Sequence, residues 1–134
     1  MHVPLIEFVA NGNTTNKNCS YKKCNKKISW THLKNIFPTF TGLDSPLETN
    51  IDESGSCNAF FDGSSINFYA EGGGCNATAK IPDVVYHEYG HAINSGRYNS
   101  GSGMWNGAMN EGFADIWALS LTNSPILGAG WDLV

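Results

Sequence analysis

The stretch YHEYGH (residues 86–91) places two histidines four residues apart, with a glutamate directly after the first. On a helix, residues four apart share one face, so His87 and His91 can place two imidazole nitrogens about 2.0–2.1 Å from one small cation. Glu88 is offset by one residue, so it cannot comfortably join the same coordination, but it can reach a water bound to the metal. This HExxH pattern predicts two metal ligands and a general base, which is the chemistry of metal-assisted hydrolysis.

A catalytic zinc takes a third protein ligand and leaves its fourth position open. The candidates after His91 are Glu111, Asp115 and Asp132, and Glu111 is the best placed because it begins a second expected helix. Asp115 follows on the same face, where it can accept a hydrogen bond from the other ring nitrogen of a ligating histidine. Two histidines and a carboxylate favour a catalytic zinc site, because structural sites more often have four Cys or His ligands.

HExxH alone recurs by chance, so the alternative is that these side chains form two exposed polar stripes. The small residues on both helices favour the metal site instead, because the helices must approach closely for their side chains to touch one ion. These small residues are Gly90, Ala92, Gly112 and Ala114.

The segments VVYHEYGHAIN (84–94) and NEGFADIWAL (110–119) resemble the gluzincin metallopeptidases, and more closely their fungalysin-like and thermolysin-like branches. The resemblance implies zinc as the cofactor and Glu88 as the general base. It also implies His87, His91 and Glu111 as zinc ligands, with Asp115 as the partner of a ligating histidine. Asn110, next to the third ligand, matches the family pattern as well, which implies that it too supports the ligands from behind without binding the metal.

Upstream, NAFFDG (58–63) resembles the edge strand on which these enzymes lay the substrate backbone, which implies Asn58 and Ala59 as substrate-binding residues. The resemblance covers residues 40–122 well and the first 30 poorly. It departs in one respect, because these peptidases carry a further histidine, and often a tyrosine, that stabilise the tetrahedral intermediate. No histidine follows His91 here, so we expect a partial catalytic domain whose C-terminal helical subdomain is missing.

The remaining pattern predicts the elements that must position these residues. Two β-prone runs, 59–61 and 66–69, flank the turn-forming sequence DGSS and predict a hairpin. Helical spacing predicts a short helix over 30–37, ended by Pro38, and a helix from about Asp83 to Ser95. A last helix should run from Ala108 to Thr122. Its expected core stripe consists of Phe113, Ile116, Trp117 and Leu121.

Together these elements predict an α+β fold with a zincin-like core. A small, mostly antiparallel sheet should pack on the HEYGH helix, followed by the helix that carries Glu111. At 134 residues the chain suits a single domain, in which residues 1–30 form an irregular, Lys- and Asn-rich segment, with a short hairpin over 11–27 as the alternative. Residues 31–134 form the expected zinc-binding core.

Charge excludes some partners. The formal net charge is −4, and the first 34 residues hold six of the eight basic residues and one of the twelve acids. Their net charge of +5 leaves −9 on the remainder, which argues against a nucleic-acid surface. No apolar run is long enough to cross a bilayer. The resemblance to the metallopeptidases implies a protein or peptide substrate as the partner.

The four cysteines lack the CxxC spacing of zinc ribbons and redox sites, and two local disulfides, Cys19–Cys24 and Cys57–Cys75, are the simpler account. Disulfides persist in oxidising compartments, so we expect a secreted protein; four free thiols are the alternative.

The expected function is that of a zinc metalloendopeptidase. The alternative is a zinc-binding module that acts in stability or partner binding without turnover. Calcium is also open, because Asp52, Glu53 and Asp83 could contribute to a site, although their spacing fits no EF-hand loop.

Overall fold

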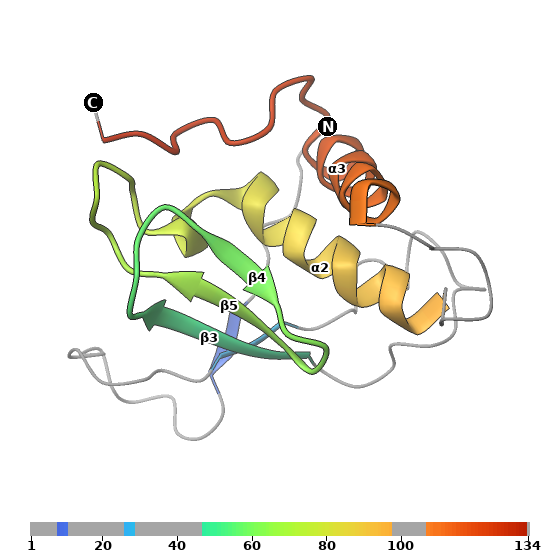
Figure 1. Ribbon diagram of the computed structural model, residues 1–134, viewed down its shortest axis with the longest axis horizontal. Helices are drawn as coiled ribbons and strands as arrows, with labels where there is room; N and C mark the ends of the chain where they lie inside the picture. Colours follow the sequence, from blue (N-terminus) through green and yellow to red (C-terminus); the bar gives the residue numbers. More distant parts are fainter. Residues whose placement is uncertain (1–7, 11–25, 29–46, 98–106, 134) are drawn as a thin grey trace.

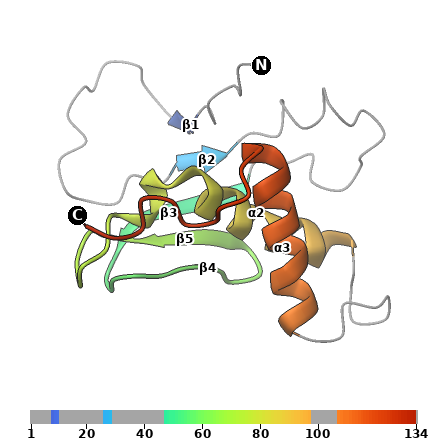
Figure 2. The same cartoon turned by 90° about the horizontal axis from the view of Figure 1, so that it is seen from above.

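The computed structural model describes residues 8–10, 26–28, 47–97 and 107–133, which form an α+β fold (Figure 1). The described elements are β1 (Phe8–Ala10), β2 (Lys26–Ile28), β3 (Leu47–Glu53), β4 (Ala59–Phe61), β5 (Ser65–Tyr69), the 3-10 helix η1 (Thr78–Lys80), α2 (Pro82–Arg97) and α3 (Gly107–Thr122). Figure 2 shows α2 lying between the sheet and α3. The expected α+β class and both long helices are confirmed. The helix expected over 30–37 and the Cys19–Cys24 pair lie outside the described residues.

The sheet has five strands in the order β1-β2-β3-β5-β4. Among the described strands only β3 and β5 pair in parallel, and the other three pairings are antiparallel, so the expectation of a mostly antiparallel sheet holds. The predicted hairpin is present as β4 and β5, with Ala59 opposite Phe68. Strands β1 and β2 form a short antiparallel pair within the segment expected to be irregular or a hairpin. The strand β4 lies at the edge of the sheet.

One face of α2 holds the helix against the sheet. Val85, Tyr89 and Ile93 recur every four residues, are buried, and belong to one core cluster with Ile66 and Phe68 of β5. Side chains four apart lie on the same helical face, so this contact fixes the rotation of α2 about its axis. The side chains of His87 and His91 are thereby turned away from the core of the sheet and toward α3.

The expected core stripe of α3 is half wrong. Trp117 and Leu121 pack against the core, but the exposed fractions of Phe113 and Ile116 are 38% and 59%. The fully buried residues of α3 are Ala114 and Ala118. This helix packs on α2 through small side chains, and the large apolar residues cannot fit between two helices that lie so close.

A disulfide joins Cys57 to Cys75, with the two Cα atoms 5.3 Å apart, which confirms that predicted pair. It ties the residue before Asn58 to the loop after β5. No described helix is long and apolar enough to span a bilayer.

We expect the carboxylate of Asp62 in the hairpin turn to make the free energy of unfolding depend on pH. Asp62 Oδ1 accepts hydrogen bonds from the backbone nitrogens of Ser64 (2.8 Å) and Ser65 (2.7 Å), which hold the pKa of its carboxyl well below the usual range. Asp62→Ala should lower the free energy of unfolding at pH 7 by on the order of 1 kcal/mol. A depressed pKa gives stability above the unfolded pKa of about 3.9 that is lost as pH falls below it.

Chemical denaturation of both proteins at pH 7 and at about pH 2.5 would measure this effect, with the exposed Glu48→Ala as a control carboxylate. The cost of Asp62→Ala should shrink at the acidic pH. An equal cost at both pH values would show that the ionised carboxylate does not stabilise the turn.

Candidate metal centre

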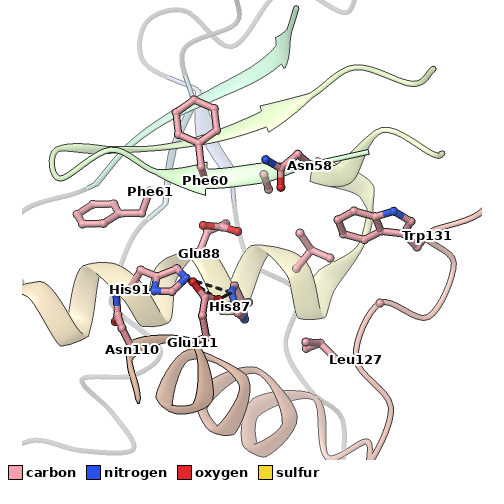
Figure 3. A pocket seen from close by; sticks show the side chains of 13 residues that line it. Asn58, Phe60, Phe61, His87, Glu88, His91, Asn110, Glu111, Leu127 and Trp131 are labelled. Atoms are coloured by element: carbon pink, nitrogen blue, oxygen red, sulfur yellow. Dashed lines mark hydrogen bonds and ion pairs between the residues drawn. The ribbon is translucent and has the colours of Figure 1, made fainter. Parts of the chain in front are cut away.

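Three side chains from α2 and α3 converge on one point. His87 Nε2 lies 3.1 Å from His91 Nε2, and Glu111 Oε2 lies 3.0 Å from the former and 3.4 Å from the latter (Figure 3). Ligand atoms that share a tetrahedral zinc at 2.0–2.1 Å lie about 3.3 Å from one another. The three separations between these nitrogen and oxygen atoms are close to the edge length of such a tetrahedron. The triad of His87, His91 and Glu111 can therefore hold a metal ion, as their spacing predicted.

Asp115 orients one of the two histidines. Its Oδ1 lies 2.8 Å from His87 Nδ1, one turn of α3 beyond Glu111. A proton on Nδ1 donates to this carboxylate and leaves the lone pair of Nε2 directed at the triad. The expected contact between Asp115 and His87 is thus present, and its role in metal coordination stays a prediction. His91 Nδ1 is buried and has no hydrogen-bond partner among the described residues.

The two helices meet at Gly90. A Cβ atom added to Gly90 would lie only 2.8 Å from the Cα of Ala114, which is backbone and cannot move aside. Gly90 lies one residue before His91, and Ala114 three after Glu111, so the close approach occurs beside the triad. Of the other small residues predicted to allow it, Ala92 is buried, whereas a Cβ on Gly112 would meet nothing within 4 Å. Because Gly90 has no side chain, the two helices can lie close enough for the candidate ligands to meet.

Glu88 is a buried carboxyl group, 5% exposed, and one of its oxygens has no hydrogen-bond partner among the described residues. Burial raises the pKa of Glu88 to about 8, the negative charge of Glu111 adds to the rise, and a backbone hydrogen bond from Phe61 opposes it. A dication at the triad would favour the ionised form, because opposite charge stabilises a carboxylate. Glu88 is thus placed next to the triad without belonging to it.

The triad lies in a cleft of about 690 Å³ that four segments surround. Figure 3 shows β4 on one side, α2 with the histidines and Glu88 in the middle, α3 on the other side, and Leu127 and Trp131 at the right-hand end. The lining residues are Asn58, Ala59, Phe60 and Phe61 before and on β4, Val84, His87, Glu88 and His91 on α2, Asn110 and Glu111 on α3, and Leu127, Gly128 and Trp131 after α3. All predicted site residues except Asp115, which lies behind His87, therefore line one cavity.

The segment after α3 forms a wall of this cleft, which the sequence analysis did not find. Gly128 N donates to Asp83 Oδ2 at 2.6 Å, and the side chain of Asn76 donates to the backbone oxygen of Gly130 at 2.9 Å. Leu127 and Trp131 bring apolar side chains to the cavity. The segment has no helical or strand period, so no pattern in the sequence pointed to it.

Asp83 also bears on the calcium hypothesis. Its two oxygens accept hydrogen bonds from the backbone nitrogens of Val84 and Gly128. Within the described residues, Asp52, Glu53 and Asp83 form no group with the geometry of a metal site. The buried Asp83 holds the wall segment instead.

Comparisons with known proteins add no relative. No protein-family model matches the chain, and no curated protein matches it. The inference about function therefore rests on the site itself.

The close approach at Gly90 generates a matched pair of variants. Gly90→Ala should destabilise the protein by about 1–3 kcal/mol, because the new methyl group forces α2 and α3 apart. It should also weaken zinc binding, although Gly90 has no ligand atom. Gly112→Ala has open space and should stabilise the helix by about 0.5–1 kcal/mol.

Thermal unfolding and zinc titration of both variants would measure these effects. Equal zinc affinity in Gly90→Ala and the parent would show that the helix spacing does not control the triad.

A second prediction concerns the hydrogen bond behind His87. The chain should bind one zinc, His91→Ala should lose it, and Asp115→Ala should weaken its binding by about 10- to 100-fold. Competition with a chromophoric chelator gives these affinities. Asp132→Ala removes an exposed acid elsewhere and is the control for net charge. A zinc affinity in Asp115→Ala equal to that of Asp132→Ala would contradict the orienting role.

Proposed function

We propose that this chain is a zinc metallopeptidase core of the gluzincin type, a hydrolase that cleaves peptide bonds within a protein or peptide substrate. One observation carries the proposal: three ligand atoms converge at 3.0–3.4 Å beside a buried carboxyl group that lines the same cleft. Two histidines and a carboxylate are the ligands of a catalytic rather than a structural zinc.

The residues divide the chemistry between them. His87, His91 and Glu111 would hold the zinc, and Asp115 would keep His87 in the tautomer that coordinates. A bound zinc would supply positive charge that polarises the scissile carbonyl and lowers the pKa of a water toward ~7. Glu88 would accept the proton of the attacking water and deliver it to the leaving amine. Its burial and its unpaired oxygen suit that exchange.

The edge strand suits an extended substrate. The strand β4 pairs only with β5 within the described sheet, so its outer edge can add the backbone of a peptide. Asn58 and Ala59, at the start of β4, line the cleft beside the triad. An extended peptide on this edge would cross the triad, with Leu127 and Trp131 lining one end of the same cleft.

Secretion fits the same proposal. The Cys57–Cys75 disulfide is of the kind that persists in an oxidising compartment, and it ties down the start of the edge strand.

A zinc-binding module without turnover is the second candidate, and one observation favours it. Among the described residues that line the cleft there is no Lys, Arg or Tyr, and the only histidines are the two of the triad. Removing one stabiliser of a developing oxyanion typically slows a reaction about a hundred- to a thousand-fold. We therefore expect slow hydrolysis by this chain.

The substitution Glu88→Gln separates the two candidates. It should leave zinc binding intact, because Glu88 is not a ligand, and should lower the rate of hydrolysis by on the order of 10²–10⁴ through loss of the base. Zinc content and cleavage of a quenched fluorescent peptide would be measured together. The exposed Glu48→Gln is the control. Cleavage by Glu88→Gln at the parent rate would refute the mechanism, and zinc binding by a parent that cleaves nothing would favour the module.

A further inference from the structure

A buried amide links the two helices beside the triad. Asn94, three residues after His91 on α2, is 2% exposed. Its Nδ2 donates to the backbone oxygen of Asn110 at 3.2 Å and to the side-chain Oδ1 of Asn110 at 2.8 Å. Its own Oδ1 is buried without a partner among the described residues. A buried amide with only half of its hydrogen bonds formed lowers the stability of the fold, so packing alone does not explain an asparagine at this position.

These contacts fix the orientation of both amide groups. A backbone oxygen can only accept, so the atom of Asn94 that faces it must be the amide nitrogen. The same nitrogen also contacts the side chain of Asn110, which must therefore present its oxygen there. The amide nitrogen of Asn110 is left as the free end, and within the described residues it has no hydrogen-bond partner.

Asn110 belongs to the cleft as well as to this contact. It lines the cavity next to Glu111, and Figure 3 places it beside His91 at the end away from Trp131. No Lys or Arg lines the cleft among the described residues, and besides Asn110 its amide and indole donors are those of Asn58 and Trp131. The side chain of Asn110 is partly exposed, and an amide nitrogen with two protons is suited to a neutral oxygen acceptor.

We propose that Asn110 is a substrate-binding residue whose amide nitrogen donates a hydrogen bond to a backbone carbonyl of a bound peptide. Asn94 is the positioning residue that holds this amide in the donating orientation. The inference rests on the proposed function, since a peptide must occupy the cleft. It assigns to Asn110 a role in binding peptide that is separate from holding the metal.

The test is peptide binding without turnover. Zinc-loaded protein that carries Glu88→Gln is titrated into a fluorescently labelled, end-blocked hexapeptide of alanine, leucine and phenylalanine, and binding is followed by anisotropy. Asn110→Ala should raise the Kd for the peptide about three- to tenfold, the equivalent of one hydrogen bond, with zinc affinity unchanged. Ser120→Ala, an exposed polar position on the same helix, is the control and should change neither affinity.

A double-mutant cycle tests the role of Asn94. In the Glu88→Gln protein, Asn94→Ala should raise the peptide Kd when Asn110 is present. It should have no further effect when Asn110 is already alanine. An equal effect in both backgrounds overturns the positioning role. If Asn94→Ala cannot be loaded with zinc, Asn110→Ala still tests the donor, because the side chain of Asn110 is partly exposed.

The other outcomes separate this inference from the proposed function. A peptide Kd unchanged by Asn110→Ala overturns the donor and leaves the peptidase proposal standing. Parallel losses of zinc and peptide affinity in Asn110→Ala overturn it too, because the residue would then act through the triad. Zinc-loaded protein that binds no peptide in any variant overturns both.

Discussion

The close approach of α2 and α3 is the constraint on which the site depends. Each helix alone carries an incomplete ligand set, two imidazoles on one and a carboxylate on the other. The separation of 3.0 Å between His87 Nε2 and Glu111 Oε2 exists because Gly90 has no side chain where the Ala114 backbone lies. A short carboxylate side chain reaches only a few ångströms, so a wider helix spacing would leave the third ligand out of range. The capacity of this site to hold a metal depends on helix packing as much as on the motif.

The same packing explains why polar groups are buried around the triad. Glu88 and Asn94 lie on the α2 surface that α3 and β4 cover, and each has an oxygen without a partner in the described part of the chain. Such groups reduce stability, and the apolar contacts of Val85, Tyr89 and Ile93 on the other side of the helix offset that loss. One face of α2 therefore stabilises the fold, and the other carries the side chains of the candidate site. The division follows the helical period, because the two sets alternate along α2.

This division also decides what could be predicted from the sequence. Both helices and the convergence of the candidate ligands followed from local spacing, because His87 and His91 must share a face whatever surrounds them. The contact between Asp115 and His87 followed for the same reason, and the base role of Glu88 stays a prediction. The expected stripe of α3 failed at Phe113 and Ile116, because hydrophobicity alone does not say that a helix packs through its alanines.

Other features depend on contacts between distant residues. The strand β3 reads as LETNIDE and buries Thr49 rather than an alternating apolar set, so its parallel pairing with β5 has no local signal. The wall formed by Leu127 and Trp131 is set by hydrogen bonds that span more than 40 residues. Asn94 was missed because an asparagine on a helix is usually a surface residue, and its burial becomes visible only when α3 lies against it.

Helix α2 holds the other three segments that surround the cleft in place. The first turn holds the segment after α3 through Asp83, the middle holds the sheet through Val85 and Tyr89, and the last turns hold α3 through Gly90 and Asn94. A rotation of α2 would therefore displace the edge strand, the third ligand and the apolar wall together. Because the core fixes that rotation, the metal ligands and the surface that would receive a substrate keep one geometry relative to each other. The residues of α2 that set this geometry are therefore not the candidate metal ligands themselves.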